Sequence, residues 1–261
     1  MRLEPGTVAV VTGAASGIGR ALARALAARG MALVLTDVEE APLAEVAGAL
    51  GAVGWRALDV ADDAAVDAFA ASVPAPHLVC NVAGVVGPRV PTWEQRPADW
   101  EWIWRVNLVG VANVLRAFVP ALVARGTGHV VNVASIAGLA PVIGGGNAPY
   151  VASKYAVVGV SETLRVELDA HAPAVGVTVV CPGPVATNIR DAERNRPASL
   201  GGGDLAATPP AFTNVAARIT ADDAAAQIVR AVEEDRFYLL TNPENAPEAR
   251  ARVDRLLADL P

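Results

Sequence analysis

The sequence is poor in several residue types that mark particular classes of protein. Its 261 residues include two cysteines and three histidines, and aromatic residues make up only 5%. Cys80 and Cys181 lie far apart, each within an apolar run, so buried free thiols are expected rather than a disulfide or a metal site. His77, His129 and His171 show no spacing typical of metal ligands. The sequence therefore predicts no metal centre.

Charge and hydropathy argue against two further classes. The 21 Lys and Arg residues against 27 Asp and Glu give a formal net charge of −6, and no basic cluster indicates a nucleic-acid-binding surface. No apolar run reaches the length of a membrane span, because polar residues and Pro141 interrupt the longest, 129–146. Glu4 and Pro5 interrupt the N-terminal stretch, which lacks a signal-peptide pattern. We expect a cytoplasmic protein that binds neither nucleic acid nor membrane.

The abundant residues indicate an α/β fold. Hydrophobic residues make up 53% of the chain, enough for a large core. Strands are predicted at 7–13, 31–37, 52–60, 77–84, 128–135, 175–183 and 236–242, and helices at 18–30, 41–51, 62–72, 97–126 (with Pro120 as a possible kink) and 148–172. Apolar strands separated by helices indicate a doubly wound parallel sheet of about seven strands, with helices on both faces. We expect a single domain, 1–261, with a lid loop at about 184–219.

A glycine-rich segment, TGAASGIG, lies between the first predicted strand and the helix after it. Gly13 permits a tight turn, Gly17 lets the backbone approach a pyrophosphate, and Gly19 lets the helix pack close to the sheet. The start of that helix offers unpaired N–H groups and a partial positive charge to phosphates. Three glycines alone can form any tight turn, but their position between strand and helix predicts dinucleotide binding.

Asp37, at the end of the second predicted strand, indicates which dinucleotide binds. A carboxylate there can accept hydrogen bonds from both hydroxyls of the adenosine ribose, and it repels a 2′-phosphate. No Arg or Lys lies nearby in the sequence to reverse that preference, so NAD is predicted rather than NADP. The alternative is a strand-end Asp that only forms a turn. Asp59, after the third strand, either caps the next helix or contacts the adenine.

Lys154 is the only lysine among the 21 basic residues. It follows Tyr150 by one helical turn, so both side chains lie on one face of a helix that Asn147 is expected to cap and Pro149 to begin. An ammonium beside a phenol favours the phenolate and lowers the tyrosine pKa from its usual value of about 10. Tyr150 would then be a general acid and base near neutral pH. An exposed pair without a catalytic role is the alternative.

Two further polar residues are candidates for the same site. Ser135 ends the fifth predicted strand, at the carboxyl edge of the sheet, where its hydroxyl can hold a carbonyl or stabilise an alkoxide. Asn107 is polar within an otherwise apolar helical stretch. It either holds a water molecule beside Lys154 or bonds a nearby backbone carbonyl.

The motifs TGAASGIG, NVAG, VNLVGV, SIAG, YVASK and CPGPVAT, in this order, resemble those of the short-chain dehydrogenases/reductases. The resemblance extends from about Thr7 to Ile189 and implies a Rossmann-like fold. It implies a catalytic tetrad of Asn107, Ser135, Tyr150 and Lys154, in which Lys154 also binds the nicotinamide ribose. Cofactor contacts are implied for Gly13, Ser16, Gly17, Ile18, Gly19, Asp37, Asp59, Val60, Asn81, Ala83, Gly84, Tyr150, Lys154, Pro182, Gly183, Val185 and Thr187.

Three features depart from the usual pattern of that family. Val82 replaces the second asparagine of the family motif NNAG, and the stretch between Ser135 and Tyr150 is slightly longer than usual. The extra length should border the substrate. Four tryptophans fall within 93–104, where helix packing or a subunit interface is favoured over substrate stacking.

The resemblance implies an NAD-dependent enzyme that interconverts a small-molecule secondary alcohol and a ketone. An NADPH-dependent ketoreductase of the 3-oxoacyl reductase type is one alternative, and a non-catalytic dinucleotide-binding protein is another. A homotetramer or homodimer is also implied. Arg190, Arg194 and Arg196 in the lid could contact an acidic substrate, although a solvated face is favoured. The apolar stripe of the last segment, 246–261, should pack on the core or on a neighbouring subunit.

Overall fold

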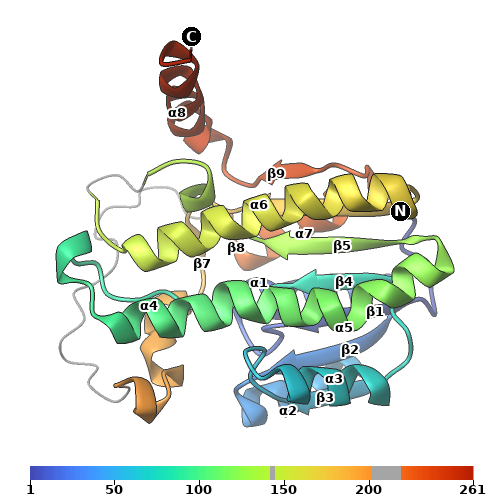
Figure 1. Ribbon diagram of the computed structural model, residues 1–261. Coiled ribbons are helices and arrows are strands. Elements are labelled where there is room, and N and C mark those ends of the chain that lie inside the picture. The colour runs from blue at the N-terminus through green and yellow to red at the C-terminus, as the bar shows by residue number, and fades with distance from the viewer. Residues whose placement is uncertain (142–144, 202–218, 261) are drawn as a thin grey trace.

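Seven parallel strands form one sheet at the centre of the protein. The computed structural model describes residues 1–141, 145–201 and 219–260, and the sheet has the order β3-β2-β1-β4-β5-β6-β9 (Figure 1). Its strands are β1 (Val8–Thr12), β2 (Ala32–Asp37), β3 (Gly54–Ala57), β4 (Leu78–Asn81), β5 (Gly128–Val133), β6 (Val175–Cys181) and β9 (Tyr238–Leu240). All seven predicted strands are confirmed, and so is the doubly wound parallel arrangement.

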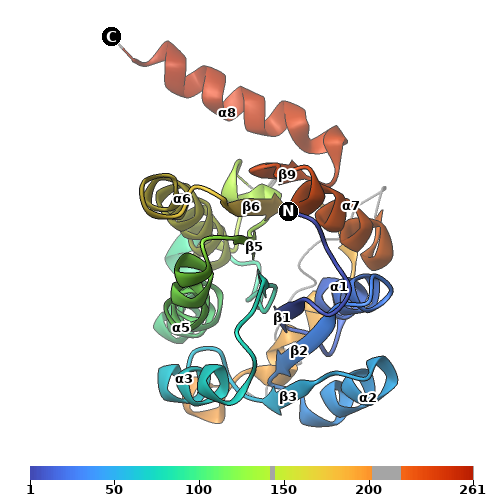
Figure 2. The same ribbon diagram turned by 90° about the vertical axis from the view of Figure 1, so that its right-hand side faces the viewer.

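Helices cover both faces of the sheet. Figure 2 shows α1, α2 and α7 on one face and α3, α5 and α6 on the other. The bounds are α1 (Gly17–Ala27), α2 (Glu40–Leu50), α3 (Asp63–Ser72), α4 (Pro97–Trp104), α5 (Gly110–Arg125), α6 (Ala148–His171), α7 (Ala221–Glu233) and α8 (Ala246–Ala258). This arrangement follows from right-handed crossover connections, which place successive helices on one face until the strand order reverses.

The strand order reverses between β1 and β4, and this point positions the candidate site. The chain builds outward from β1 to β2 and β3, then returns to β4 on the other side of β1. The loops after β1 and β4 therefore diverge to opposite faces and leave a crevice at the carboxyl ends of the strands. They approach closely at its base, where a Cβ on Gly13 would lie 2.9 Å from Ala83 Cα.

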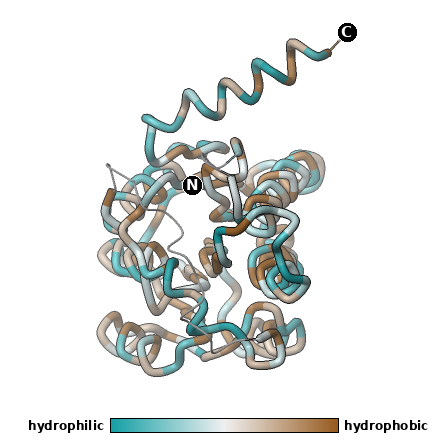
Figure 3. Tube along the Cα trace, turned by 90° about the vertical axis from the view of Figure 1, so that its left-hand side faces the viewer, coloured by the Kyte–Doolittle hydropathy of each residue, from teal (hydrophilic) through white to brown (hydrophobic). Residues whose placement is uncertain are grey.

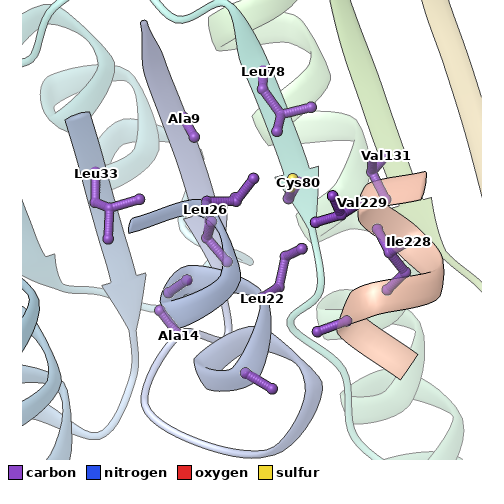
Figure 4. Close-up of a cluster of buried hydrophobic side chains, with 14 of the residues drawn as sticks. Ala9, Ala14, Leu22, Leu26, Leu33, Leu78, Cys80, Val131, Ile228 and Val229 are labelled. Carbon is purple, nitrogen blue, oxygen red and sulfur yellow. The ribbon is translucent and has the colours of Figure 1, made fainter. Parts of the chain in front are cut away.

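Two apolar layers enclose the sheet. Leu22 and Leu26 of α1 meet Ile228 and Val229 of α7 over β1 and β4, as Figure 4 shows. On the other face, α3, α5 and α6 bury a second cluster that includes Phe69. Both cysteines are free and buried, as the sequence predicted.

Two differences from the expected helices have local causes. Helix α7 was not predicted, although a Thr220–Asp223 capping box precedes its apolar face. The stretch predicted as one helix, 97–126, contains the π-helical segment η2 (Arg105–Val109). The predicted kink at Pro120 is not where the α-helix is interrupted, because α5 continues past this residue. The interruption lies at η2. Such π-helical turns occur frequently at functional sites.

Within the described residues, one continuous stretch of helix, Pro97–Arg125, is long and apolar enough to cross a membrane. The most apolar 18 residues have a mean hydropathy of 1.7, and 39% of them are buried. This corrects the expectation from sequence, because scattered charges such as Arg105 and Arg116 concealed the apolar average. The finding is weak evidence for a membrane, since core helices pass the same test, and this stretch packs against β4, β5 and α6.

Helix α8 projects from the body of the protein (Figures 1 and 3). None of its residues is buried against the described part of the chain. The apolar side chains of Val253, Leu256 and Leu257 are 44%, 52% and 59% exposed. The prediction that this stripe packs on the core is therefore wrong, whereas packing on a neighbouring subunit stays a prediction.

Replacement of Ile228 by Ala should destabilise the fold because α7 is held by apolar packing. Its side chain is completely buried, so the loss should be about 2–5 kcal/mol in free energy of unfolding. Urea denaturation followed by circular dichroism would measure it. Val53→Ala is the control, because Val53 is 57% exposed, with an expected change within about 0.5 kcal/mol. An equal loss in the two variants would contradict the assignment of Ile228 to the core.

Candidate active site

A cavity of about 600 Å³ opens at the carboxyl ends of the strands. The residues predicted from sequence to contact a cofactor line it, with one exception. The lining includes Gly13, Ser16, Gly17, Ile18, Gly19, Asp37, Asp59, Val60, Ala83, Gly84, Tyr150, Lys154, Pro182, Gly183, Val185 and Thr187, and also Ser135. The sheet edge therefore collects residues from distant parts of the sequence into one site.

Asn81 is the exception. Its side chain is buried in β4, and its amide Nδ2 donates a hydrogen bond of 2.8 Å to Asn132 Oδ1 on β5. Asn132 in turn donates to Ser161 Oγ of α6. The motif NVAG contributes Val82, Ala83 and Gly84 to the cavity, while its asparagine side chain joins neighbouring strands. The contact of Asn81 with a cofactor stays a prediction.

The glycines of the first loop are required by close contacts. A Cβ on Gly19 would lie 2.0 Å from the carbonyl oxygen of Gly13. A Cβ on Gly17, whose φ is +50°, would lie 3.1 Å from Thr187 Cγ2. Helix α1 begins here, and Ser16 at its N-cap makes no side-chain capping bond. The first N–H groups of α1 are thus unpaired at the cavity, where the start of the helix also carries a partial positive charge. This cradle fits a pyrophosphate.

Asp37 ends β2 with its carboxylate at the cavity. It accepts hydrogen bonds from the backbone N–H of Ala15 at 2.9 Å and of Glu39 at 3.1 Å. Burial raises the pKa of Asp37, and these N–H donors oppose that rise. Asp59 also lines the cavity, but it accepts from Ala61 N–H; Asp62 is the residue that caps α3. The capping alternative for Asp59 is therefore wrong.

Tyr150, Lys154 and Ser135 meet at the inner end of the cavity. All three are buried. The Lys154 ammonium lies 5.7 Å from the centre of the Tyr150 ring and donates a hydrogen bond of 2.9 Å to the carbonyl of Val133. Ser135, two residues beyond the end of β5, hydrogen-bonds Tyr150. Helix α6 thus places a phenol and a cation beside the carboxyl end of a central strand.

The pKa values of this pair are governed by burial. Burial raises the pKa of Tyr150, and the Ser135 hydrogen bond opposes that rise. Burial likewise lowers the pKa of Lys154 to about 8. For the protein alone, the net pKa of Tyr150 is therefore raised and not lowered as predicted, because the loss of water around the buried phenol outweighs the hydrogen bond that favours its phenolate.

Asn107 lies inside the η2 segment and is completely buried. Its Oδ1 accepts from Val85 N–H at 2.8 Å, and its Nδ2 donates to Val85 O and to Ser153 Oγ, each at 3.0 Å. The backbone-binding alternative is thus the observed one. A Cβ on Gly84 would lie 3.4 Å from both Asn107 Oδ1 and Lys154 Nζ, so the two side chains flank the same point.

Asn147 begins α6 as predicted, with Pro149 in the first turn, but it does not cap the helix through its side chain. Its backbone is left-handed, at φ +60°. Both polar atoms of its buried side chain lack hydrogen-bond partners in the described residues. The start of α6, beside Tyr150, therefore relies on tertiary packing.

The outer part of the cavity is mainly apolar. Val85, Val86, Trp102 and Ala192 pack around Tyr150 in one cluster, and Arg89 lies on the lining. Trp102 thus faces the cavity, whereas Trp93 is 85% exposed. Trp102 is 2% exposed and packs within this cluster, which agrees with the favoured packing role, and it also lines the cavity.

Two arginines tie the segment after β7 (Val185–Ala186) to the body of the protein. Arg196 is buried and pairs with Asp99 of α4 and with Glu193, and its guanidinium lies 4.6 Å from the centre of the Trp102 ring. Arg194 pairs with Glu39. The favoured solvated interpretation is wrong for Arg196, which is buried, whereas Arg194 is paired but stays exposed. Their partners are remote in sequence, so no sequence pattern indicated the pairs. Residues 202–218 of the predicted lid lie outside the described residues.

Comparison with known proteins agrees with this geometry. A family profile described as short chain dehydrogenase matches residues 7–198. The chain is 39% identical to a 1-deoxy-11-beta-hydroxypentalenate dehydrogenase of Streptomyces avermitilis, over 94% of this chain and 87% of that protein. A short-chain dehydrogenase/reductase from Burkholderia phymatum in complex with NAD is 36% identical, with a TM-score of 0.91 over 100% of this chain and 98% of that one.

A second related structure was solved with a different cofactor. It is a short-chain dehydrogenase from Burkholderia cenocepacia in complex with NADP, 29% identical, with a TM-score of 0.76 over 99% of this chain and 95% of that one. The parallel sheet, the glycine cradle and these relatives define a nucleotide-binding oxidoreductase of the Rossmann type. This chain belongs to the short-chain dehydrogenase family.

Gly19→Ala should destabilise the protein because the new methyl group would overlap the Gly13 carbonyl oxygen. Overpacking of this kind costs about 1–3 kcal/mol or more. Gly48→Ala in α2 is the control, since no described atom lies within 4 Å of its Cβ position, and a helical Gly→Ala change there stabilises by about 0.5–1 kcal/mol. Chemical denaturation measures both. Equal stabilisation of the two variants would refute the close contact.

Lys154→Met should stabilise the protein at pH 7. The buried ammonium has a pKa of about 8 against an ordinary value of 10.5, so the unfolded chain binds more protons between these values and wild-type stability rises with pH there. The advantage of the variant should be on the order of 2 kcal/mol at pH 7, partly offset by the lost bond to Val133, and should shrink by pH 10. Urea denaturation at both pH values measures it; a pH-independent difference would contradict the shift.

Proposed function

We propose that the protein is an NAD-dependent oxidoreductase that interconverts a secondary alcohol and a ketone, with Tyr150 as general acid and base. The observation that carries this proposal is the convergence of Tyr150, Ser135 and Lys154 on the cavity that also holds the glycine cradle and Asp37. A nucleotide-binding residue set and a proton-transfer group thus share one enclosed space. Neither feature alone would specify the reaction.

The residues of the cavity fit a nicotinamide dinucleotide. The N–H groups at the start of α1 would hold the pyrophosphate, and the Asp37 carboxylate would accept the hydroxyls of the adenosine ribose. Lys154 would hold the hydroxyls of the nicotinamide ribose. When bound, the nicotinamide supplies the hydride acceptor or donor.

Tyr150 is suited to hold and move a proton at the substrate oxygen. Its raised pKa keeps the phenol protonated at neutral pH, as proton donation to a ketone requires. For alcohol oxidation the phenolate must form, and the nearby Lys154 ammonium would stabilise it. Ser135, bonded to Tyr150, would hold the substrate oxygen beside the phenol. Asn107, bonded to Val85 and to Ser153, would hold the loop after β4 and helix α6 in place around Lys154.

Two observations bear on the choice of cofactor. The Asp37 carboxylate at the cavity favours NAD, and the relative from Burkholderia phymatum, with the higher TM-score of the two, is a complex with NAD. The NADP complex of another relative supports the alternative of an NADPH-dependent ketoreductase. Asp37 favours NAD because its carboxylate would repel the negative charge of a 2′-phosphate beside it.

The apolar outer cavity supports an apolar alcohol as substrate. Val85, Val86, Ala192 and Trp102 offer van der Waals contact and few polar atoms, as expected of a pocket for a hydrophobic small molecule. The Streptomyces avermitilis relative is named for a hydroxypentalenate, an alcohol that also carries a carboxylate.

We also propose a homotetramer or homodimer, supported by the exposed apolar stripe of α8. A cytoplasmic location is part of the same proposal.

Tyr150→Phe should abolish turnover while NADH still binds, because it removes only the proton carried by the phenol. Alcohol oxidation followed by NADH absorbance, with a panel of apolar secondary alcohols, measures the rate, and NADH fluorescence measures binding. Tyr155→Phe on the same helix is the matched control and should keep wild-type activity. Turnover of the Tyr150 variant within about tenfold of wild type would rule out the assigned role, since general acid–base catalysis contributes about 10²–10⁴-fold.

A further inference from the structure

The ion pair between Arg194 and Glu39 joins two segments that border the adenosine end of the cavity. Arg194 Nε and Nη2 donate to the two carboxylate oxygens of Glu39 at 2.9 and 2.6 Å. Its Nη1 donates to the backbone carbonyls of Asp191 at 2.8 Å and Asn188 at 3.4 Å. The guanidinium is therefore held in a two-pronged contact with one carboxylate and anchored to its own segment, η4 (Ile189–Asn195).

The position of this pair relates it to Asp37. Glu39 lies two residues after Asp37, where β2 leads into α2, and Asp37, Glu39 and Arg194 all line the cavity. Asp37 is close enough to Arg194 to raise the pKa of the guanidinium, although Glu39 contributes most to that rise. The fold thus brings a cation close to the carboxylate that is expected to favour NAD. No sequence pattern indicated this, because Arg194 is far from β2 along the chain.

This cation could in principle reverse the choice of cofactor. A 2′-phosphate on the adenosine ribose is accommodated where an arginine is available near the end of β2. An arginine that already binds a carboxylate with two of its nitrogens is not available in that way, and Glu39 adds a second negative charge beside Asp37. Glu39 therefore opposes a 2′-phosphate in two ways. It occupies the guanidinium of Arg194, and its own negative charge repels the phosphate.

We propose that Glu39 determines cofactor choice together with Asp37, by holding the Arg194 guanidinium away from the 2′ position of the adenosine ribose. This inference rests on the proposed nicotinamide-dependent function and adds two residues, Glu39 and Arg194, to the determinants of its specificity. Neither residue touches the reacting atoms. Their effect is on which dinucleotide is bound.

The test is a cycle of three variants: Glu39→Gln, Arg194→Gln and the double variant. Glu39→Gln keeps the size of the side chain but removes the charge that holds Arg194, so the affinity for NADPH relative to NADH should rise by about tenfold or more, the effect of one charge-assisted hydrogen bond. Arg194→Gln should produce no such rise. The double variant should lose the gain of Glu39→Gln, since the freed guanidinium is what binds the phosphate.

Dissociation constants for NADH and NADPH, measured by nucleotide fluorescence, are the primary readout, and thermal unfolding verifies that each variant folds. The ratio of kcat/KM for the two cofactors is a second readout. Asp67→Asn is the matched control, because Asp67 forms a comparable exposed pair with Arg116 between α3 and α5, and it should leave the NADPH-to-NADH ratio unchanged. A salt series should reduce the gain of Glu39→Gln, as expected for a phosphate contact.

Three results would overturn the inference. The first is an NADPH-to-NADH affinity ratio in Glu39→Gln within about twofold of the wild-type ratio. That change is well below the roughly tenfold change expected from one charge-assisted hydrogen bond. The second is an equal rise in the double variant, which would assign the effect to the charge of Glu39 without Arg194. The third is a wild-type protein that binds neither nucleotide, which would remove the proposed function as well. A protein that binds and turns over NADH with an unchanged ratio would remove this inference alone.

Discussion

The candidate site depends on a charged group held where water is excluded. The Lys154 ammonium is buried, with the Val133 carbonyl as its hydrogen-bond acceptor and the Tyr150 ring beside it. Burial makes the cation costly, and the lowered pKa is the sign of that cost. A fold gains no stability from such a group, so its retention indicates a role that needs a compact cation next to a phenol.

The parallel sheet supplies the positions that this chemistry requires. Because parallel strands end at the same edge, Thr12, Asn81 and Val133 close neighbouring strands there, and the loops after them reach one crevice. Thr12 Oγ1 accepts from the backbone N–H groups of both Val82 and Ala83, which fixes the loop after β4 against β1. The phosphate cradle and the proton-transfer residues are thus held by one rigid element, an arrangement that favours accurate orientation of reactants.

The segment after β7 is joined to that rigid element by ion pairs as well as by the apolar contacts of Ala192. Arg196 is buried between Asp99, Glu193 and the Trp102 ring, and Arg194 holds Glu39 at the far side of the cavity. A buried ion pair such as Arg196–Asp99 contributes little net stability but is specific in geometry, since breaking it leaves an unpaired charge. The segment after β7 is therefore tied both to α4 and to the start of α2.

The sequence by itself determined the strands, most helices, the glycine cradle, Asp37 and the Tyr150–Lys154 spacing, because these depend on local periodicity and on residues close together in the chain. Only the tertiary structure decided the pKa of Tyr150, the backbone bonds of Asn107, the burial of Asn81 between strands and the partners of Arg194 and Arg196. Each of these depends on desolvation or on a partner distant in sequence. Such effects arise only when the packed fold sets which groups lose water and which charges meet.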